Sequence, residues 1–196
     1  EKIIPFYGIH PWHLDKIDLS SPFWLDHLQT FLLQNPHAGI GEIGLDKIKA
    51  KKGLVFCLEN QIKVLSLQLE LAQKLNRPVT IHQGGYTQKI IAILTPYKSL
   101  KILFHGFSGS KETAQILVHL GFYLSFLPQQ EQKLQKIKPI LPINQLFLET
   151  DGKKENKENF ENFYKKVALL WGCSFSDFKK RMIENAKVFT GSPAFR

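Results

Sequence analysis

Cysteine and methionine are scarce in this sequence, whose 196 residues include two cysteines and one methionine. Cys57 and Cys173 lie far apart, so they provide neither a disulfide framework nor the close spacing of a zinc knuckle. This usage is typical of a reducing compartment, and we expect a cytoplasmic protein.

Long apolar runs are also absent. No segment has the length needed to span a bilayer, and no basic and then apolar leader precedes the first predicted strand. We therefore expect a soluble protein with no membrane partner. Hydrophobic residues make up 43% of the chain, enough to bury one substantial core, and we expect a single domain over residues 1–196.

Acidic residues are fewer than basic ones, 17 against 26, which gives a formal net charge of +9. This excess favours polyanionic partners such as nucleic acids, but it is common among globular proteins and is weak support by itself.

Short runs of β-branched and aromatic residues alternate with helical stripes along the chain, a pattern typical of βα units on a parallel sheet. These strands are too apolar for a sheet with a wet face, so we expect helices to cover them. The predicted strands are 3–10, 38–45, 78–82, 101–107, 122–126 and 145–151. The predicted helices are 23–34, with Ser21 as N-cap and Pro22 at the first helical position, 58–72, 113–120, 160–170 and 177–189. Residues 128–139 are predicted to form a surface connection or a short solvated helix.

Glu42 is an unexpected residue inside its predicted strand. A carboxylate among Ile40, Ile43 and Leu45 must be exposed, paired or bound to a metal, because burying an uncompensated charge is costly.

Three other polar residues, His82, His105 and Asp151, stand at or near the ends of apolar strands. Each alone has an ordinary explanation, a hydrogen-bonded strand-end histidine or a turn aspartate. In a parallel barrel, however, the carboxyl ends of the strands meet at one face, so all four side chains are expected to converge. Oxygen and imidazole ligands together suit Zn, Mn or Mg, and a carboxylate can bridge two ions.

Five segments resemble the TatD family of metal-dependent hydrolases and deoxyribonucleases, in the same order and over almost the whole chain. They are GIHPW (8–12), GEIGLDK (41–47), PVTIH (78–82), FHGFSG (104–109) and LETD (148–151), and ENAKVFTG follows near the end. The resemblance implies a TIM-barrel fold of the amidohydrolase type. It also implies that phosphodiester bonds are hydrolysed with the help of one or two divalent metal ions.

The resemblance also assigns roles to individual residues. It implies that Glu42 bridges the metals, that His82 and His105 bind one metal, and that Asp151 binds the other and handles the proton of the water. His10 corresponds to a family histidine that contacts substrate or supports the site, although a cap before Pro11 explains it equally well.

Two features depart from the family pattern. The family opens with a His-x-His strand that supplies two metal ligands, and no such motif occurs here; IHQGG also lacks an arginine that members often carry. A complete barrel takes about 250 residues, so we expect this chain to lack the first strand and to begin inside the second βα unit. One metal would then keep Glu42, His82 and His105, whereas the other would keep only Glu42 and Asp151, and we expect unequal affinities.

Lysines flank the predicted site. Segment 46–52 carries four of them, including Lys47, and Lys153 and Lys154 follow Asp151. Such lysines can hold a nucleic-acid backbone, although loop lysines are often merely solvated. We expect DNA or a short nucleic acid as substrate, contacted by His10 and Lys47. An amidohydrolase-like enzyme acting on a small molecule and a degenerate, non-catalytic barrel stay open as alternatives.

Overall fold

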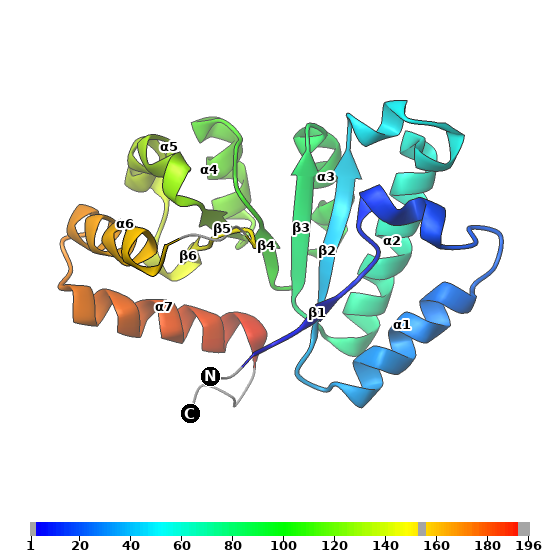
Figure 1. Cartoon of the computed structure of the whole chain (residues 1–196), viewed down its shortest axis with the longest axis horizontal. Helices are drawn as coiled ribbons and strands as arrows, with labels where there is room; N and C mark the ends of the chain where they lie inside the picture. Colours follow the sequence, from blue (N-terminus) through cyan, green and yellow to red (C-terminus); the bar gives the residue numbers. More distant parts are fainter. Residues whose placement is uncertain (1–2, 153–155, 192–196) are drawn as a thin grey trace. The chain divides into compact units, whose positions relative to one another are not determined.

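The computed structural model describes residues 3–152 and 156–191, and the chain divides into two compact units, Glu1–Leu103 and Phe104–Arg196. Strands alternate with helices in both units (Figure 1), which confirms the predicted succession of βα units. The predicted single domain stays a prediction. Among the described residues, no helix is both long enough and apolar enough to cross a bilayer.

The first unit contains three parallel strands, β1 (Phe6–Tyr7), β2 (Gly39–Asp46) and β3 (Val79–Gly84), with β2 paired to both neighbours. The apolar side chains of β2 are fully buried, as its sequence predicts. Gly44 has a positive φ of 156°, and a Cβ there would clash with the carbonyl oxygen of His82. Glycine therefore permits the close approach of β2 to β3.

Strand β1 is much shorter than the predicted 3–10. Pro5 has no N–H to donate to a ladder, and a 3-10 helix, η1 (Pro11–Lys16), begins soon after Gly8. Between β1 and β2 lies α1 (Phe23–Gln34), whose N-cap is Pro22 instead of the predicted Ser21. The Ser21 hydroxyl still accepts a hydrogen bond from the Phe23 N–H, at 3.3 Å.

Helix α2 (Leu58–Leu75) packs along β2 and is the longest helix of the first unit (Figure 1). It buries Val64, Leu65, Leu69 and Ala72 and ends at Asn76 in the left-handed conformation. Helix α3 (Thr87–Leu94) follows β3 and was not predicted. The remaining helical segments of this unit are short 3-10 turns, η2 (Lys49–Lys51), η3 (Leu54–Phe56) and η4 (Thr95–Tyr97).

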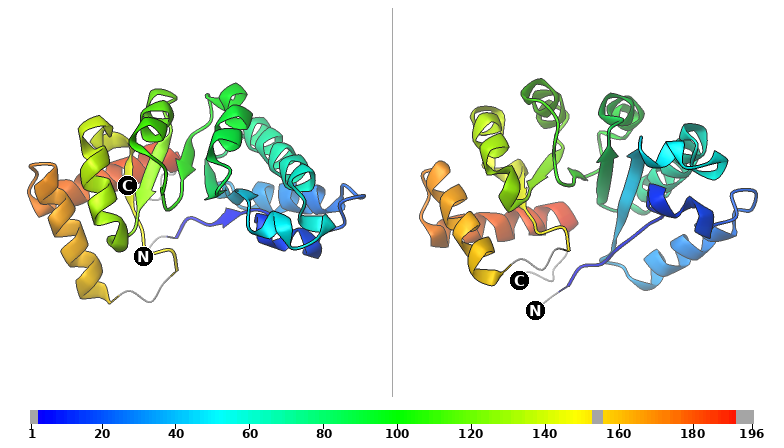
Figure 2. Two further views of the ribbon diagram at one scale, coloured as in Figure 1. Left: turned by 90° about the horizontal axis from the view of Figure 1, so that it is seen from above. Right: turned by 45° about the horizontal axis from the view of Figure 1, so that its top comes forward.

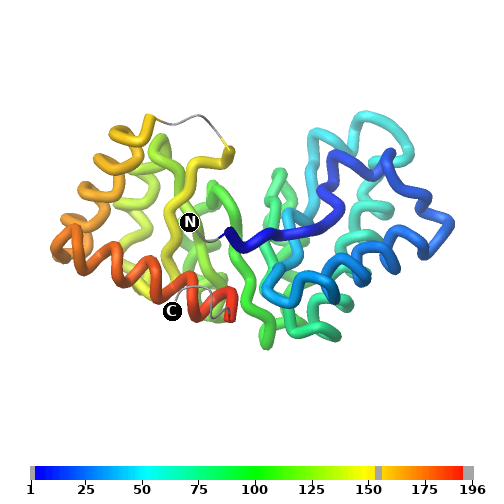
Figure 3. Tube along the Cα trace, turned by 60° about the horizontal axis from the view of Figure 1, so that its bottom comes forward, coloured from blue at the N-terminus to red at the C-terminus, as the bar shows by residue number. Residues whose placement is uncertain are grey.

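Strand β4 (Ile102–Phe104) spans the division between the units in the sequence. In the second unit β5 (Tyr123–Phe126) and β6 (Leu146–Leu148) are parallel neighbours, and α4 (Lys111–His119) packs against β5 (Figure 2). Helices α6 (Lys157–Leu170) and α7 (Phe175–Thr190) contact each other, and the chain turns sharply between them (Figure 3).

Residues 128–139 form η5 (Pro128–Gln130), α5 (Glu131–Ile137) and most of η6 (Lys138–Ile140); one further 3-10 turn, η7 (Ile143–Gln145), precedes β6. Of the two predicted alternatives, a surface connection or a short solvated helix, the structure shows the helix, and this helix is partly buried. Leu134 and Ile137, spaced by three residues, lie on one helix face and are almost completely buried.

Candidate functional site

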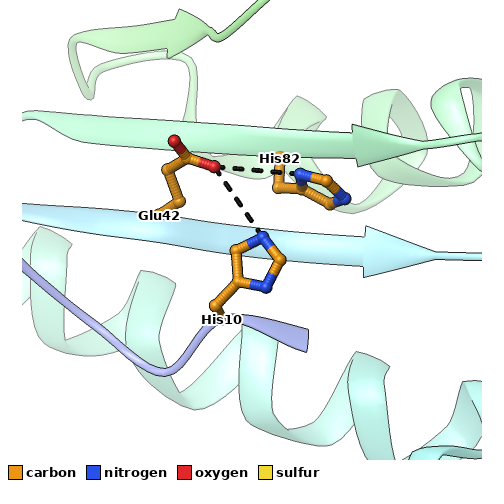
Figure 4. Close-up of side chains that lie close together, drawn as sticks. All are labelled: His10, Glu42 and His82. Atoms are coloured by element: carbon orange, nitrogen blue, oxygen red, sulfur yellow. Dashed lines mark ion pairs between the residues drawn. The ribbon is translucent and has the colours of Figure 1, made fainter. Parts of the chain in front are cut away.

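Glu42 lies in the middle of β2 with its carboxylate between two histidines (Figure 4). Its Oε2 atom is 3.8 Å from Nε2 of His10, which follows β1, and 3.8 Å from Nδ1 of His82, which belongs to β3. One ligand atom from each of these three residues lies within 4.8 Å of the other two. Ligand atoms around a tetrahedral zinc ion are about 3.3 Å apart, so Glu42 Oε2 and His82 Nδ1, 3.8 Å apart, can share a divalent cation after a small contraction.

The other ring nitrogen of His82 has its own carboxylate partner. His82 Nε2 lies 3.1 Å from Oδ2 of Asp46, the last residue of β2. When Nε2–H donates to Asp46, the neutral ring keeps the lone pair of Nδ1 directed toward Glu42. Histidines that bind metals usually donate their second ring N–H to a carboxylate in this way. The His82 ring is therefore oriented as a ligand by Asp46.

Asp46 is itself fixed on several sides. Its carboxylate accepts hydrogen bonds from the indole N–H of Trp12 at 2.9 Å and from the backbone N–H of Lys49 at 2.6 Å. The buried amide of Gln61 on α2 accepts from the Asp46 N–H at 2.7 Å and donates to its carbonyl oxygen at 3.1 Å. A Cβ at Gly84 would lie 2.5 Å from Asp46 Oδ2, so glycine there leaves room for this carboxylate.

The pKa values follow from these contacts. Burial opposes protonation of His82, but hydrogen bonds to Glu42 and Asp46 outweigh it and raise its pKa. Burial also works against ionisation of Asp46, yet the hydrogen bonds from Lys49, Trp12 and His82 keep its pKa below the ordinary value. Asp46 is therefore a carboxylate at neutral pH.

His10 differs from His82 in its tautomer. Its Nδ1 accepts a hydrogen bond from the Trp12 N–H at 3.1 Å, so the neutral ring carries its proton on Nε2, which faces Glu42. Burial, reinforced by the nearby His82, lowers the pKa of His10 to about 4. A neutral ring with Nε2 protonated is a hydrogen-bond donor, which suits a substrate contact better than metal ligation.

A similar arrangement occurs in the second unit. His105 directly follows β4, and its Nδ1 lies 2.7 Å from Oε2 of Glu149, whose Oε1 accepts from the Gly106 N–H at 2.6 Å. Its Nε2 lies 3.3 Å from Oδ1 of Asp151. Asp151 has a positive φ of 54° and a half-exposed carboxylate. Asparagine and aspartate tolerate this conformation better than most residues, and here it accompanies a carboxylate directed at His105.

The structure thus brings together two sets of predicted residues. Glu42 and His82 lie together with His10 in the first unit, and His105 lies beside Asp151 in the second. Convergence of all four predicted ligands stays a prediction. Lys47 is exposed immediately after β2, and Lys153 and Lys154 lie outside the described residues.

Sequence reasoning missed three residues of the two sets, Trp12, Asp46 and Glu149. The two acids stand inside the motifs GEIGLDK and LETD, so an acidic residue beside each apolar strand end was the available signal. Which histidine nitrogen each acid fixes could not be read from the sequence, because that depends on the ring orientation.

Comparisons with known proteins agree with this geometry. Residues 1–191 match the sequence model of the family described as TatD related DNase. The human deoxyribonuclease TATDN3 is 31% identical over 166 residues, which cover 76% of this chain and 57% of that protein. The metal-dependent hydrolase YabD of Bacillus subtilis is 27% identical, over 92% of this chain and 76% of its own length. The chain thus spans little more than half of the human relative.

Solved structures show the same fold. The crystal structure of YjjV, a TatD homologue from Escherichia coli K12, superposes with a TM-score of 0.81 at 25% identity, covering 97% of this chain and 77% of that one. The predicted TIM-barrel fold is confirmed, since the solved structures of TatD-like proteins that resemble this chain are TIM barrels. The match to the family model, the fold and the paired histidine–carboxylate groups all indicate the same family. The chain belongs to the TatD family.

Proposed function

We propose that this protein is a metal-dependent hydrolase that cleaves phosphodiester bonds in DNA. The observation that carries the proposal is the position of His82, whose Nδ1 lies 3.8 Å from Glu42 Oε2 while its Nε2 lies 3.1 Å from the Asp46 carboxylate. A cation held by Glu42 and Nδ1 would leave Nε2–H as the donor to Asp46, which is the usual arrangement of a metal-binding histidine. Membership of a family with relatives named as deoxyribonucleases and metal-dependent hydrolases supports the reaction class.

The atoms that we propose as ligands of a divalent cation (Zn, Mg or Mn, one ion or two) are Glu42 Oε2 and His82 Nδ1 in the first unit, and His105 Nε2 and Asp151 Oδ1 in the second. When bound, such a cation supplies Lewis acidity toward phosphoryl oxygens and acidifies water. Asp46 and Glu149 hold the two imidazoles in the tautomers that leave these lone pairs available.

Three side chains have proposed roles toward substrate and water. The half-exposed Asp151 carboxylate accepts the proton released by the attacking water, since it is the most accessible of the four proposed ligands. His10 donates its Nε2–H to a non-bridging phosphate oxygen, as its tautomer permits. The exposed ammonium group of Lys47 contributes charge for a neighbouring phosphate.

The test measures digestion of a labelled single-stranded DNA by the purified protein, before and after chelation and after adding back Mg, Mn or Zn. We expect activity that chelation abolishes and a metal ion restores, and that Glu42→Gln removes. Glu70→Gln, an exposed carboxylate on α2, is the matched control and retains activity. Activity insensitive to chelation, or full activity in Glu42→Gln, contradicts the proposal.

Salt dependence distinguishes DNA from a small-molecule substrate. Phosphate contacts release counterions, so the affinity for DNA falls steeply with salt concentration, whereas binding of a small neutral ester need not. Turnover of such esters without salt-dependent DNA binding would favour the small-molecule alternative.

A further inference from the structure

Trp12 has a half-exposed indole beside the His10–Glu42–His82 group. Its side chain is 50% exposed, although tryptophan is highly buried on average. The ring centroid lies 5.3 Å from that of His10 and 6.1 Å from that of His82, both in edge-on arrangements. The indole thus borders the candidate metal ligands while keeping much of its surface open to solvent.

The indole is also held in place. Its N–H donates to Asp46 Oδ2, and its backbone N–H donates to His10 Nδ1 within the first turn of η1. The buried residues of η1 are Pro11 and Leu14, so the hydrophobic core does not require the tryptophan ring. A half-exposed aromatic ring that is held by a hydrogen bond can bind a flat ligand at a low entropic cost, because its rotamer is already set.

We propose that Trp12 is a stacking platform for a nucleobase of a single-stranded substrate, next to the phosphate that is cleaved. The inference rests on the proposed function and goes beyond it by assigning a base-binding subsite. Aromatic side chains in single-strand sites bind bases by stacking, without sequence preference. The ring centroids of His10 and His82 lie 5.3 and 6.1 Å from that of Trp12, so a base stacked on the indole would lie beside the candidate metal ligands.

Stacking on Trp12 requires a base whose face is uncovered. In a duplex both faces of an internal base are covered by its neighbours, so only a single strand or a frayed end can present one. The subsite therefore predicts a preference for single-stranded DNA or strand ends over internal duplex sites.

Asp46 connects this subsite to positive charge. One carboxylate oxygen accepts from Trp12 and the other from the N–H of Lys49, within the segment that carries Lys47, Lys51 and Lys52. The same residue thus anchors the proposed stacking ring and the lysine segment. A base stacked on Trp12 would bring its flanking phosphates toward these lysines, which is the combination that single-strand sites use.

The test measures binding by fluorescence anisotropy with chelator present, so that cleavage does not interfere. The probes are a fluorescein-labelled oligothymidylate and a strand of equal length with abasic sites. Wild-type protein should bind the intact strand more tightly. Trp12→Ala should weaken that binding about 5- to 150-fold, the equivalent of about 1–3 kcal/mol per stacked base, and leave abasic binding unchanged.

Two further variants separate stacking from other effects. Trp12→Phe keeps an aromatic face without the N–H to Asp46, and it should bind much more tightly than Trp12→Ala. Phe23→Ala removes another exposed aromatic side chain, on α1 and 70% exposed, and should bind like the wild type. The wild-type affinities for the intact and the abasic strand can be compared without any variant. This comparison is therefore valid even if Trp12→Ala fails to fold.

Three results overturn the proposal: equal wild-type affinity for both strands, wild-type affinity in Trp12→Ala, or a loss in Trp12→Phe as large as in Trp12→Ala. Each leaves the proposed nuclease function standing if the wild type still binds and cleaves DNA. A wild-type protein that binds neither strand, and digests none with metal present, overturns both.

Discussion

Asp46 Oδ2 lies 3.1 Å from Nε2 of His82, on the side of the imidazole opposite Glu42. When the ring is neutral and Nε2–H donates to Asp46, Nδ1 is the nitrogen that can bind a cation. The same oxygen also accepts from the indole of Trp12, so the candidate ligand and the proposed stacking ring depend on one buried carboxylate.

Asp46→Asn should lower metal affinity about 10- to 100-fold, because the amide no longer fixes the tautomer and orientation of His82. The measurement is a competition titration against a metal-binding dye. Asp15→Asn alters a solvent-exposed carboxylate of η1 and should leave the affinity unchanged. Unaltered affinity in Asp46→Asn would show that His82 is not oriented through Asp46.

Glu149→Gln should have the corresponding effect in the second unit. Glu149 accepts both from His105 Nδ1 and from the Gly106 N–H, so the substitution weakens the orientation of His105 and the turn after β4 together. We expect weaker metal binding, read by the same titration, and a lower melting temperature of the metal-free protein. Glu112→Gln on α4 is the control, since it changes an exposed carboxylate of the same unit. A variant with wild-type values for both quantities contradicts this role.

The metal-free protein should lose stability on acidification through His10. Its folded pKa is about 4 and its ordinary value is 6.5, so between these pH values the unfolded chain binds a proton that the folded chain does not. The free energy of unfolding therefore falls as the pH drops from 6.5 to 4, by about 3 kcal/mol at most, and His10 adds no pH dependence above 6.5.

Urea denaturation of the wild type and of His10→Asn across this pH range tests the sign. Asparagine is a good N-cap and can still accept from the Trp12 N–H, but it does not titrate. The wild type should lose more stability than the variant as the pH falls. Parallel curves, or a steeper loss in the variant, would show that burial of His10 does not lower its pKa.

Leu134→Ala should destabilise the protein by about 2–5 kcal/mol, because it removes a fully buried side chain from α5. Gln132→Ala on the exposed side of the same helix should change the free energy of unfolding by less than about 0.5 kcal/mol. Equal, small effects of the two substitutions would restore the view of residues 128–139 as a surface connection.

Strand positions were predictable where buried apolar residues recur closely along the chain. The predicted 38–45 and 78–82 differ by at most two residues at either end from β2 and β3, which bury Ile40, Ile43 and Leu45, and Val79 and Ile81. Helix α3 was missed because its eight residues contain little more than two helical turns, too few for a clear period. Strand β1 was overestimated because Pro5 cannot donate to the ladder and η1 begins at Pro11, so the pairing is limited to Phe6–Tyr7.

The candidate site was predictable only in part, for a similar reason. Glu42 was evident because a carboxylate in an apolar strand needs compensation. The role of Asp46 was not, because an aspartate at a strand end is also a common turn residue, and only the ring orientation of His82 distinguishes the two. Trp12 stands within GIHPW, but its role was not predictable, since its exposure follows from the packing of η1.

The central claim is that Glu42 and His82 bind a catalytic cation. It is tested most directly by anomalous diffraction from crystals of the protein grown with zinc or manganese, with data collected on both sides of the metal absorption edge. The account predicts an anomalous peak within about 2.0–2.2 Å of Glu42 Oε2 and His82 Nδ1, lost in Glu42→Gln and kept in Glu70→Gln. A fully occupied metal elsewhere on the protein with none at Glu42, or a peak unchanged in Glu42→Gln, would contradict it.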